Sequence, residues 1–151
     1  MSEATIWPAS AAEREWAARL MAASDPWITL GRGIDHCRAA CFHPEYELFV
    51  AGVEASPQGF ILLHPRGAMS SPYIAAIAVA PEFQGCGLGG RLLRFAEDHY
   101  RGRARHMFLC VSSFNHDARR LYERLGYDVV GELKDYVIEG ASEVLMHKWL
   151  R

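Results

Sequence analysis

One segment of the sequence, residues 73–91, constrains the fold most strongly, because an apolar strand there runs into a glycine-dense turn that opens a helix. Pro81 ends the apolar run, and glycines follow at positions 85, 87, 89 and 90. Glycine lacks a Cβ atom, so several backbone N–H groups can approach an anion here, and the start of the helix adds the positive end of its dipole. The segment therefore predicts a turn that holds a pyrophosphate group.

Hydrophobic patterns divide the rest of the chain into short strands and helices. Strands are expected at residues 4–7, 46–53, 60–63, 73–79, 107–111, 127–133 and 144–149. Helices are expected at residues 11–23 and 34–41, from residue 88 to the basic segment near Arg101, and from residue 115 or 116 to Gly126. A turn through Ser56 to Gly59 is expected to join the second and third strands into a hairpin.

The order of these elements, β-α-α-β-β-β-α-β-α-β-β, indicates the fold class. Consecutive strands in the middle favour antiparallel pairing, and the strand-helix-strand unit that follows favours a parallel crossover. We therefore expect an α/β (α+β) fold with a mixed, mostly antiparallel sheet of about six or seven strands, flanked on both faces by about four helices.

Length and charge limit the classes of protein to which the chain can belong. A chain of 151 residues fits a single domain, expected to span residues 1–151. Half of its residues are hydrophobic and its formal net charge is −2, which is not the profile of a nucleic-acid-coating protein. The first ten residues do not resemble a secretory signal, and no apolar run reaches the ~18 residues of a membrane span. We expect a cytoplasmic protein with no nucleic-acid or membrane partner.

The cysteines do not form a pattern typical of a metal or redox site. They occupy positions 37, 41, 86 and 110 without any C-x-x-C pair. His36 and His43 lie beside Cys37 and Cys41, so a metal cluster is one interpretation, but buried thiols and surface histidines explain the spacing better. No metal is expected.

The glycine turn has a second interpretation as a dinucleotide-binding loop, because Gly85-x-Gly87-x-x-Gly90 has the required spacing. Such a loop needs an acidic residue about 20 positions later for the ribose hydroxyls, and residues 109–113 contain none. No Lys-Ser/Thr pair follows the glycines, which argues against a nucleotide-triphosphate loop. A turn without any ligand is the remaining alternative.

Two motifs together resemble those of the GNAT superfamily of N-acetyltransferases. Gln84-Gly-Cys-Gly87-Leu-Gly89 matches the superfamily's Q/R-x-x-G-x-G/A signature, directly after an apolar strand. About 30 residues later, Asn115-His-Asp-Ala118-Arg-Arg-Leu121-Tyr122-Glu-Arg-Leu125-Gly126-Tyr127 resembles its N-x-x-A-x-x-L-Y-x-x-x-G-F segment. The order of elements also fits this superfamily, so the resemblance implies its acyl-CoA N-acyltransferase fold.

This resemblance implies that the chain transfers an acetyl group from acetyl-CoA, its co-substrate, to an amine. The pantetheine arm would pair with the backbone near Ile77 and Val79. The pyrophosphate would rest on the backbone amides of Gln84, Gly85, Cys86, Gly87, Leu88, Gly89 and Gly90. Asn115 would bond the pantetheine arm, with a helix cap as its alternative role. Tyr122 would protonate the leaving coenzyme A thiolate, with a core tyrosine as its alternative role.

The proton acceptor for the amine remains open at this level. Members of the superfamily often place a glutamate on the strand before the glycine turn or on the next strand, but residues 73–79 contain no acid and the next strand offers Cys110. A water chain, a hairpin carboxylate such as Glu45 or Glu47, or an amine of low pKa that needs no strong base are the alternatives.

The acceptor and the oligomeric state are also left open. The loop around Asp25, the second helix and the connection at residues 134–143 are expected to select the amine, which is a small molecule, a peptide or protein N-terminus, or a lysine. The candidates for binding the 3′-phosphate of coenzyme A are Arg91, Arg94, Arg119 and Arg120. A homodimer is compatible with the sequence, and a non-catalytic acyl-CoA sensor of the same fold is the alternative function.

Overall fold

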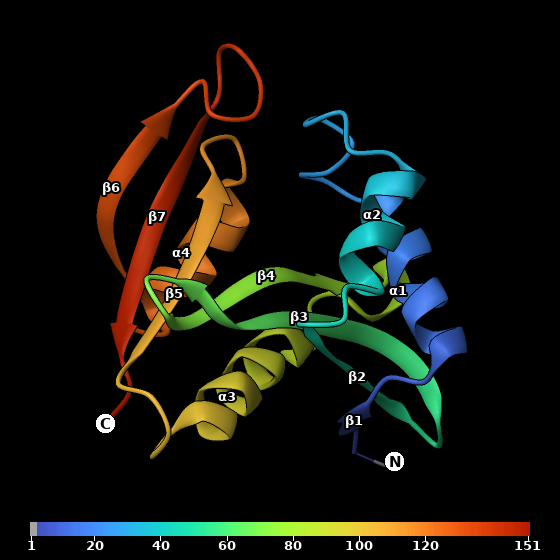
Figure 1. The fold of residues 1–151 in the computed structure, drawn as a ribbon. Helices are drawn as coiled ribbons and strands as arrows, with labels where there is room; N and C mark the ends of the chain where they lie inside the picture. Colours follow the sequence, from blue (N-terminus) through green and yellow to red (C-terminus); the bar gives the residue numbers. More distant parts are fainter. Residues whose placement is uncertain (1–2) are drawn as a thin grey trace.

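The computed structural model describes residues 3–151, and in this range seven strands form one sheet that carries four α-helices (Figure 1). The strands are β1 (Thr5–Pro8), β2 (Glu47–Val53), β3 (Ser56–Ala68), β4 (Ser71–Val79), β5 (His106–Ser112), β6 (Asp128–Lys134) and β7 (Ser142–Trp149). The helices are α1 (Ala11–Ala22), α2 (Ile34–Cys41), α3 (Leu88–Tyr100) and α4 (His116–Arg124), and a 3₁₀ turn η1 (Pro81–Phe83) precedes α3. This order of strands and α-helices is the one that the sequence predicts.

The sheet has the strand order β1-β2-β3-β4-β5-β7-β6, in which β4 and β5 are parallel neighbours and the other pairs are antiparallel. The expected mixed sheet is therefore confirmed. Within residues 3–151, β4 pairs with β5 only at Tyr73 and Ile74. Beyond Ile74 the two strands diverge, so the second half of β4 presents one backbone edge that β5 does not cover (Figure 1).

A β-bulge explains where β4 bends away. The opposite strand pairs Leu62 with Ala76 but Leu63 with Ile74, which makes Ala75 the extra residue of a bulge. A bulge bends its strand and increases the local twist. Because it falls directly after the last residue that pairs with β5, it gives a physical reason for the divergence of the two strands.

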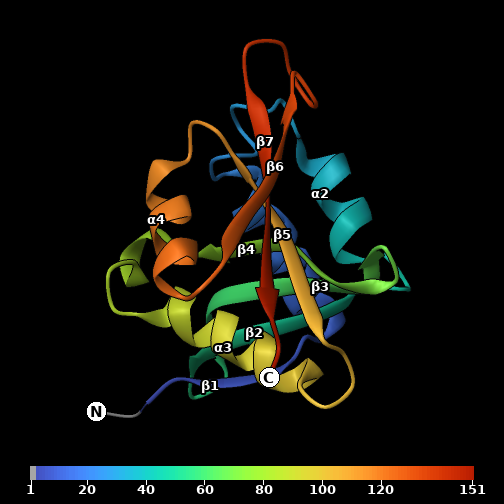
Figure 2. The same ribbon diagram turned by 90° about the vertical axis from the view of Figure 1, so that its left-hand side faces the viewer.

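The helices cover opposite faces of the sheet, because each has an apolar stripe that packs on a different core (Figure 2). Helices α1 and α2 bury Met21, Cys37 and Cys41 against β2 and β3 on one face. Helices α3 and α4 bury Leu92 and Tyr122 against the other face, beside β5 and β7. The sheet thus separates two cores, and the opening between β4 and β5 connects its two faces.

The prediction of a hairpin turn at Ser56 to Gly59 is wrong. The turn consists of Glu54 and Ala55, whose φ angles of 52° and 64° suit the tight two-residue turns that match strand twist, and β3 begins at Ser56. Pro57 is tolerated inside β3 because the register shifts between Ala51 and Gly52, directly opposite it.

The two cysteines of α2 are buried thiols, as the sequence analysis favours. Burial raises the pKa of Cys41 to about 12 and also raises the pKa of Cys37, so both stay protonated and inert. Among residues 3–151, no group of three histidines, cysteines or carboxylates could hold a metal ion. In the same range, no helix is long and apolar enough to cross a bilayer.

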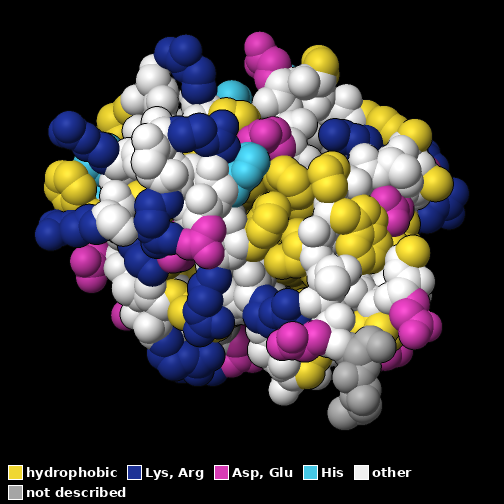
Figure 3. Space-filling view, turned by 90° about the horizontal axis from the view of Figure 1, so that it is seen from below, with side chains coloured by type: hydrophobic (Ala, Val, Ile, Leu, Met, Phe, Trp, Pro, Cys, Tyr) yellow, Lys and Arg dark blue, Asp and Glu magenta, His cyan; other side chains and the backbone are white. Residues whose placement is uncertain are grey.

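Basic side chains gather on one side of the face seen in Figure 3. One basic group lies where α3 turns into β5, where Arg101, Arg103 and Arg105 surround a surface hollow together with Arg151. Internal contacts hold several of these arginines, since Arg101 Nε donates to the Arg151 carbonyl at 2.9 Å and Arg103 donates to the His99 carbonyl at 2.7 Å. This hollow shares no lining residue with the cavity described next.

Candidate active site

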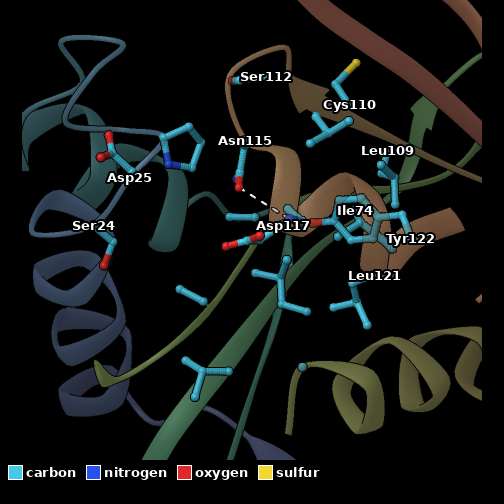
Figure 4. Close-up of a pocket in the computed structure, with 18 of the residues that line it drawn as sticks. Ser24, Asp25, Ile74, Leu109, Cys110, Ser112, Asn115, Asp117, Leu121 and Tyr122 are labelled. Carbon is cyan, nitrogen blue, oxygen red and sulfur yellow. Dashed lines mark hydrogen bonds between the residues drawn. The ribbon is translucent and has the colours of Figure 1, made fainter. Parts of the chain in front are cut away.

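A cavity of about 530 Å³ occupies the opening between β4 and β5 (Figure 4). Its walls are the diverging halves of β4 and β5, the glycine turn with the start of α3, the start of α4, and the loop between α1 and α2. The two sequence motifs, about 30 residues apart in the chain, therefore meet at one site. Nearly all of the predicted cofactor-binding residues line it, namely Ile77, Val79, Gln84, Gly85, Gly87, Leu88, Gly89, Gly90 and Asn115.

The glycine turn has the geometry of an anion site. Gly85 and Gly87 have φ angles of +81° and +85°, and Gly87 is the N-cap of α3 with no side chain capping the helix. A Cβ atom built at either glycine meets no atom within 4 Å, so the space above the turn is open. Free N–H groups at an uncapped helix start favour a bound anion. Cys86 lies in the same turn but does not line the cavity.

The free edge of β4 presents backbone groups of Ile77 and Val79 to the cavity. Ala80 N–H donates to the Gln58 carbonyl on β3 at 2.8 Å, so by alternation the groups of Ile77 and Val79 point to the opposite edge, toward the opening. Gln84 Nε2 donates to the Val79 carbonyl at 3.1 Å, which ties the glycine turn to the end of β4. An extended ligand arm could therefore pair with this edge as an added strand would.

Tyr122 lies on α4 and lines the cavity, with 7% of its surface exposed (Figure 4). Burial raises its pKa to about 12, which keeps the phenol protonated at neutral pH. No hydrogen bond engages its hydroxyl in the described chain, and no buried polar side-chain atom there lacks a partner, so the hydroxyl is reached from the cavity. Its ring also packs edge-on against Tyr127 in the core. The residue can thus donate a proton into the cavity from a rigid position.

Asn115 is the N-cap of α4, where its Oδ1 accepts a hydrogen bond from Ala118 N at 3.4 Å. The helix-cap role that the sequence left as an alternative is therefore present. Its side-chain amide also carries N–H donors, and Asn115 lines the cavity, so capping does not exhaust its hydrogen-bonding groups (Figure 4).

The hairpin carboxylates considered as proton acceptors do not line the cavity. Glu47 accepts hydrogen bonds from Tyr100 Oη at 2.6 Å and from the His99 ring at 3.2 Å, next to α3. Glu45 is also absent from the cavity lining. The sequence could not exclude them, because the face on which a strand-end side chain lies depends on the packing of α3.

A carboxylate of β7 lies in the cavity instead. Glu143 pairs with Ser112 of β5 across the two strands, and Ser112 Oγ donates to Glu143 Oε2 at 2.7 Å. Cys110 and Tyr73 line the same wall. Glu143 is the last residue of the connection at residues 134–143 that the sequence analysis expects near the acceptor, and no local pattern shows that it faces Ser112.

Of the segments expected to select the acceptor, the loop after α1 lines the cavity with Asp25, Pro26 and Trp27, whereas the second helix, α2, contributes no lining residue. The connection at residues 134–143 contributes Glu143 alone to the lining.

Among the four candidate arginines, three make contacts within the protein. Arg91 donates to the Ala4 carbonyl at 2.6 Å, Arg119 pairs with Glu123, and Arg120 pairs with Asp117. Arg94 Nη1 lies 3.7 Å from the position of a Cβ built on Gly90, next to the glycine turn. None of the four lines the cavity, whose lining contains Arg124 of α4 instead.

Comparison with known proteins adds independent findings. The sequence model of the Acetyltransferase (GNAT) family matches residues 8–127. The chain is 33% identical over 104 residues to the 5-NmdU N-acetyltransferase of Pseudomonas phage PaMx11, an alignment that covers 68% of this chain and 69% of that protein. It is 34% identical over 104 residues to an uncharacterised N-acetyltransferase of Methanocaldococcus jannaschii, covering 66% of this chain and 64% of that one.

Two solved structures show the same fold with a coenzyme bound. An aminoglycoside 6′-N-acetyltransferase complexed with coenzyme A has a TM-score of 0.80 at 16% identity, over 97% of both chains. A GNAT family acetyltransferase from Elizabethkingia anophelis with acetyl-CoA bound has a TM-score of 0.74 at 22% identity, over 97% of this chain and 98% of that one.

Proposed function

Because the chain belongs to the GNAT family of acetyltransferases, we propose that it moves the acetyl group of acetyl-CoA directly onto a primary amine within a ternary complex. The fold and the N-acetyltransferase class follow from the family, and acyl-CoA is the donor that its structural neighbours bind. One observation carries the proposal furthest. The uncapped start of α3, with its open turn at Gly85 and Gly87, faces the same cavity as the Tyr122 hydroxyl.

The residues at the cavity fit the parts of acetyl-CoA. The backbone N–H groups of residues 84–90 would hold the pyrophosphate, since open space above left-handed glycines is what such a cradle requires. The uncovered edge at Ile77 and Val79 would pair with the amide groups of the pantetheine arm, and Asn115 would donate to the same arm. Arg94 would contact a phosphate from the side of α3.

Tyr122 would act as the acid in the transfer. Its phenol stays protonated, its ring packs edge-on against Tyr127, and it lines the cavity in which the sulfur would lie. A hydrogen bond from this hydroxyl would stabilise the sulfur as it gains negative charge and becomes a better leaving group.

The test is release of coenzyme A thiol from acetyl-CoA in the presence of a panel of amines that includes alkylamines, polyamines, aminoglycosides, amino acids and short peptides. Amine-dependent thiol release, with the acetylated amine identified by mass spectrometry, is the expected result. Acetyl-CoA binding without turnover on any amine would instead favour a sensor of the same fold.

The identity of the acceptor, the location of the protein and its partners are predictions. The acceptor is a small-molecule amine, a peptide or protein N-terminus, or a lysine. A single domain over residues 1–151, a cytoplasmic location, a mechanism without metal, and the lack of nucleic-acid or membrane partners are expectations from the sequence, and a homodimer remains compatible with it.

A further inference from the structure

The two faces of the sheet divide the cavity between the two reactants. Leu109 and Val111 of β5 are buried with α3 and α4, so by strand alternation Cys110 and Ser112 face the side of α1 and α2. Val144 of β7 is buried with the same core, which places Glu143 on the side of α1 and α2 as well. The glycine turn and Tyr122, by contrast, belong to the side of α3 and α4. The donor would therefore enter from one face and the acceptor from the other.

The acceptor face contains a cluster of polar groups around one carboxylate. Tyr73 of β4 lies on this face because its neighbour Ile74 is buried with α3, and Tyr73 pairs with Phe108 two residues before Cys110. Ser112 Oγ donates to Glu143 Oε2 at 2.7 Å, which fixes the carboxylate across the β5–β7 pair. Within residues 3–151 its second oxygen, Oε1, accepts no hydrogen bond, so it is available to a ligand.

The other titratable groups of this cluster are held in their neutral forms. Burial, followed by the neighbouring Cys110 and the charge of Glu143, raises the pKa of Tyr73 well above its usual range. Burial and the charge of Glu143 also raise the pKa of Cys110, although Tyr73 lowers it. A neutral phenol and a neutral thiol are poor proton acceptors at pH 7. The carboxylate beside them is the group that can take a proton.

The other carboxylates of the cavity are placed differently. Asp25 Oδ1 accepts from Thr29 N and Thr29 Oγ1, at 3.0 and 2.6 Å, on the loop between α1 and α2. The Asp117 side chain is 91% exposed and pairs with Arg120 at the rim. Glu143 differs from both, because it is half-buried on the sheet and pairs with Ser112, three residues beyond Leu109, where the β4–β5 pairing ends.

We propose that Glu143 is the catalytic base of the acetyl transfer, an inference that rests on the function proposed above. Its carboxylate would bind the acceptor as an ammonium ion and take one proton, which leaves a neutral amine. The nitrogen lone pair would form a bond to the acetyl carbon, and the C–S bond would break with its electron pair going to sulfur. The sulfur would take a proton from Tyr122, which would regain it from the nitrogen through water. Glu143 would release its proton to solvent.

This assignment also specifies the acceptor class and a positioning residue. A half-buried carboxylate favours an acceptor that arrives positively charged, so primary alkylamines and polyamines should react better than neutral or weakly basic amines of equal size. Ser112 would act through Glu143 by holding its carboxylate in place. Both consequences can be measured.

The experiment compares E143Q with the matched control E132Q, which changes an exposed carboxylate of the neighbouring strand β6 that does not line the cavity. The rate of thiol release is measured against pH with propylamine and spermidine, and acetyl-CoA affinity by calorimetry. E143Q should lower kcat/KM for the amine about 10²- to 10⁴-fold near pH 7, with acetyl-CoA affinity unchanged. The difference in kcat/KM between E143Q and the wild type should shrink as the pH approaches the amine pKa, because the amine then deprotonates in solution.

Ser112→Ala should lower kcat/KM less than E143Q does, and this loss should also shrink as the pH approaches the amine pKa. Ser112→Thr keeps the hydroxyl group, so its kcat/KM should lie between those of Ser112→Ala and the wild type.

Equal kcat/KM in E143Q and wild type, or a rise in KM alone with an unchanged pH profile, would refute the base role and leave acetyl transfer standing. Failure of the wild type to acetylate any amine would refute the proposed function and the base role together.

Discussion

Gly87 offers the sharpest test of the anion site, because the chain contains a matched control for its backbone geometry. Gly87 has φ +85° and no atom within 4 Å of a built Cβ. Gly102, in the turn after α3 and outside the cavity lining, has φ +87° and equally open surroundings. Alanine at either position therefore introduces the same backbone strain without a steric clash. Any difference between the two variants in ligand binding must come from the place of Gly87 in the turn.

The expected magnitudes follow from this geometry. A left-handed conformation costs an L-residue about 1–2 kcal/mol, so each alanine variant should lose about 2–8 °C in Tm for a chain of this length. In Gly87→Ala the added methyl group also enters the open space above the turn, where it should hold a phosphate away from at least one backbone N–H. Losing that hydrogen bond costs about 1.5–3 kcal/mol, which raises the Kd for acetyl-CoA about 10- to 150-fold. Gly87→Glu, which adds a like charge, should abolish binding.

Thermal denaturation with and without ligand measures both effects. Acetyl-CoA at 100 times its Kd should stabilise the wild type and Gly102→Ala by about 2.7 kcal/mol, a rise in Tm of roughly 5–11 °C. Gly87→Glu should show no rise, and NAD or ATP should give none with any variant. Wild-type affinity in Gly87→Glu, or an equal loss of affinity in both alanine variants, would refute the assignment of the pyrophosphate to this turn.

Three further predictions concern catalysis and stability. Tyr122→Phe should lower kcat much more than acetyl-CoA affinity, because only the proton donor is removed, and unchanged turnover would exclude the acid role. Glu97, 3% exposed, accepts from Tyr127 Oη at 3.0 Å and from Lys148 Nζ at 2.8 Å, so Glu97→Ala should cost about 3–5 kcal/mol in unfolding experiments; a loss under about 1 kcal/mol would contradict this. A hydrogen bond from the backbone of the N-cap Ser10 lowers the pKa of Glu13 below 4.5. The contribution of this carboxylate to the free energy of unfolding is therefore complete above that pH, and it declines as the pH falls through the lowered pKa. Glu13→Gln should therefore flatten the acid limb of stability against pH, and an unchanged limb would show that the carboxylate does not contribute there.

Several features could be predicted from local sequence because local chemistry determines them. A capping box formed by Ser10 and Glu13 starts α1, with both of its hydrogen bonds present. In the glycine turn, Gly85 and Gly87 adopt left-handed conformations that glycine readily allows, and Asn115 caps α4. In each case the interacting groups lie within a few residues of one another, so the pattern of residue types contains the information.

Other features depended on packing between distant segments. The turn at Glu54 and Ala55 contains neither glycine nor proline, and it forms there because the register between β2 and β3 demands a two-residue connection. The bulge at Ala75 has no local signal, yet it accompanies the divergence of β4 from β5 that opens the cavity.

The contrast is clearest at the two ends of the site. The proposed donor end can be predicted from the sequence, because it consists of consecutive residues 84–90. The proposed acceptor end cannot, because Ser112 and Glu143 lie 31 positions apart and meet only through the pairing of β5 with β7. For the same reason the sequence does not show that the Glu47 side chain bonds to Tyr100 of α3 rather than lining the cavity. Backbone conformation follows from neighbouring residues, whereas the face and register of a strand follow from the burial of the whole sheet.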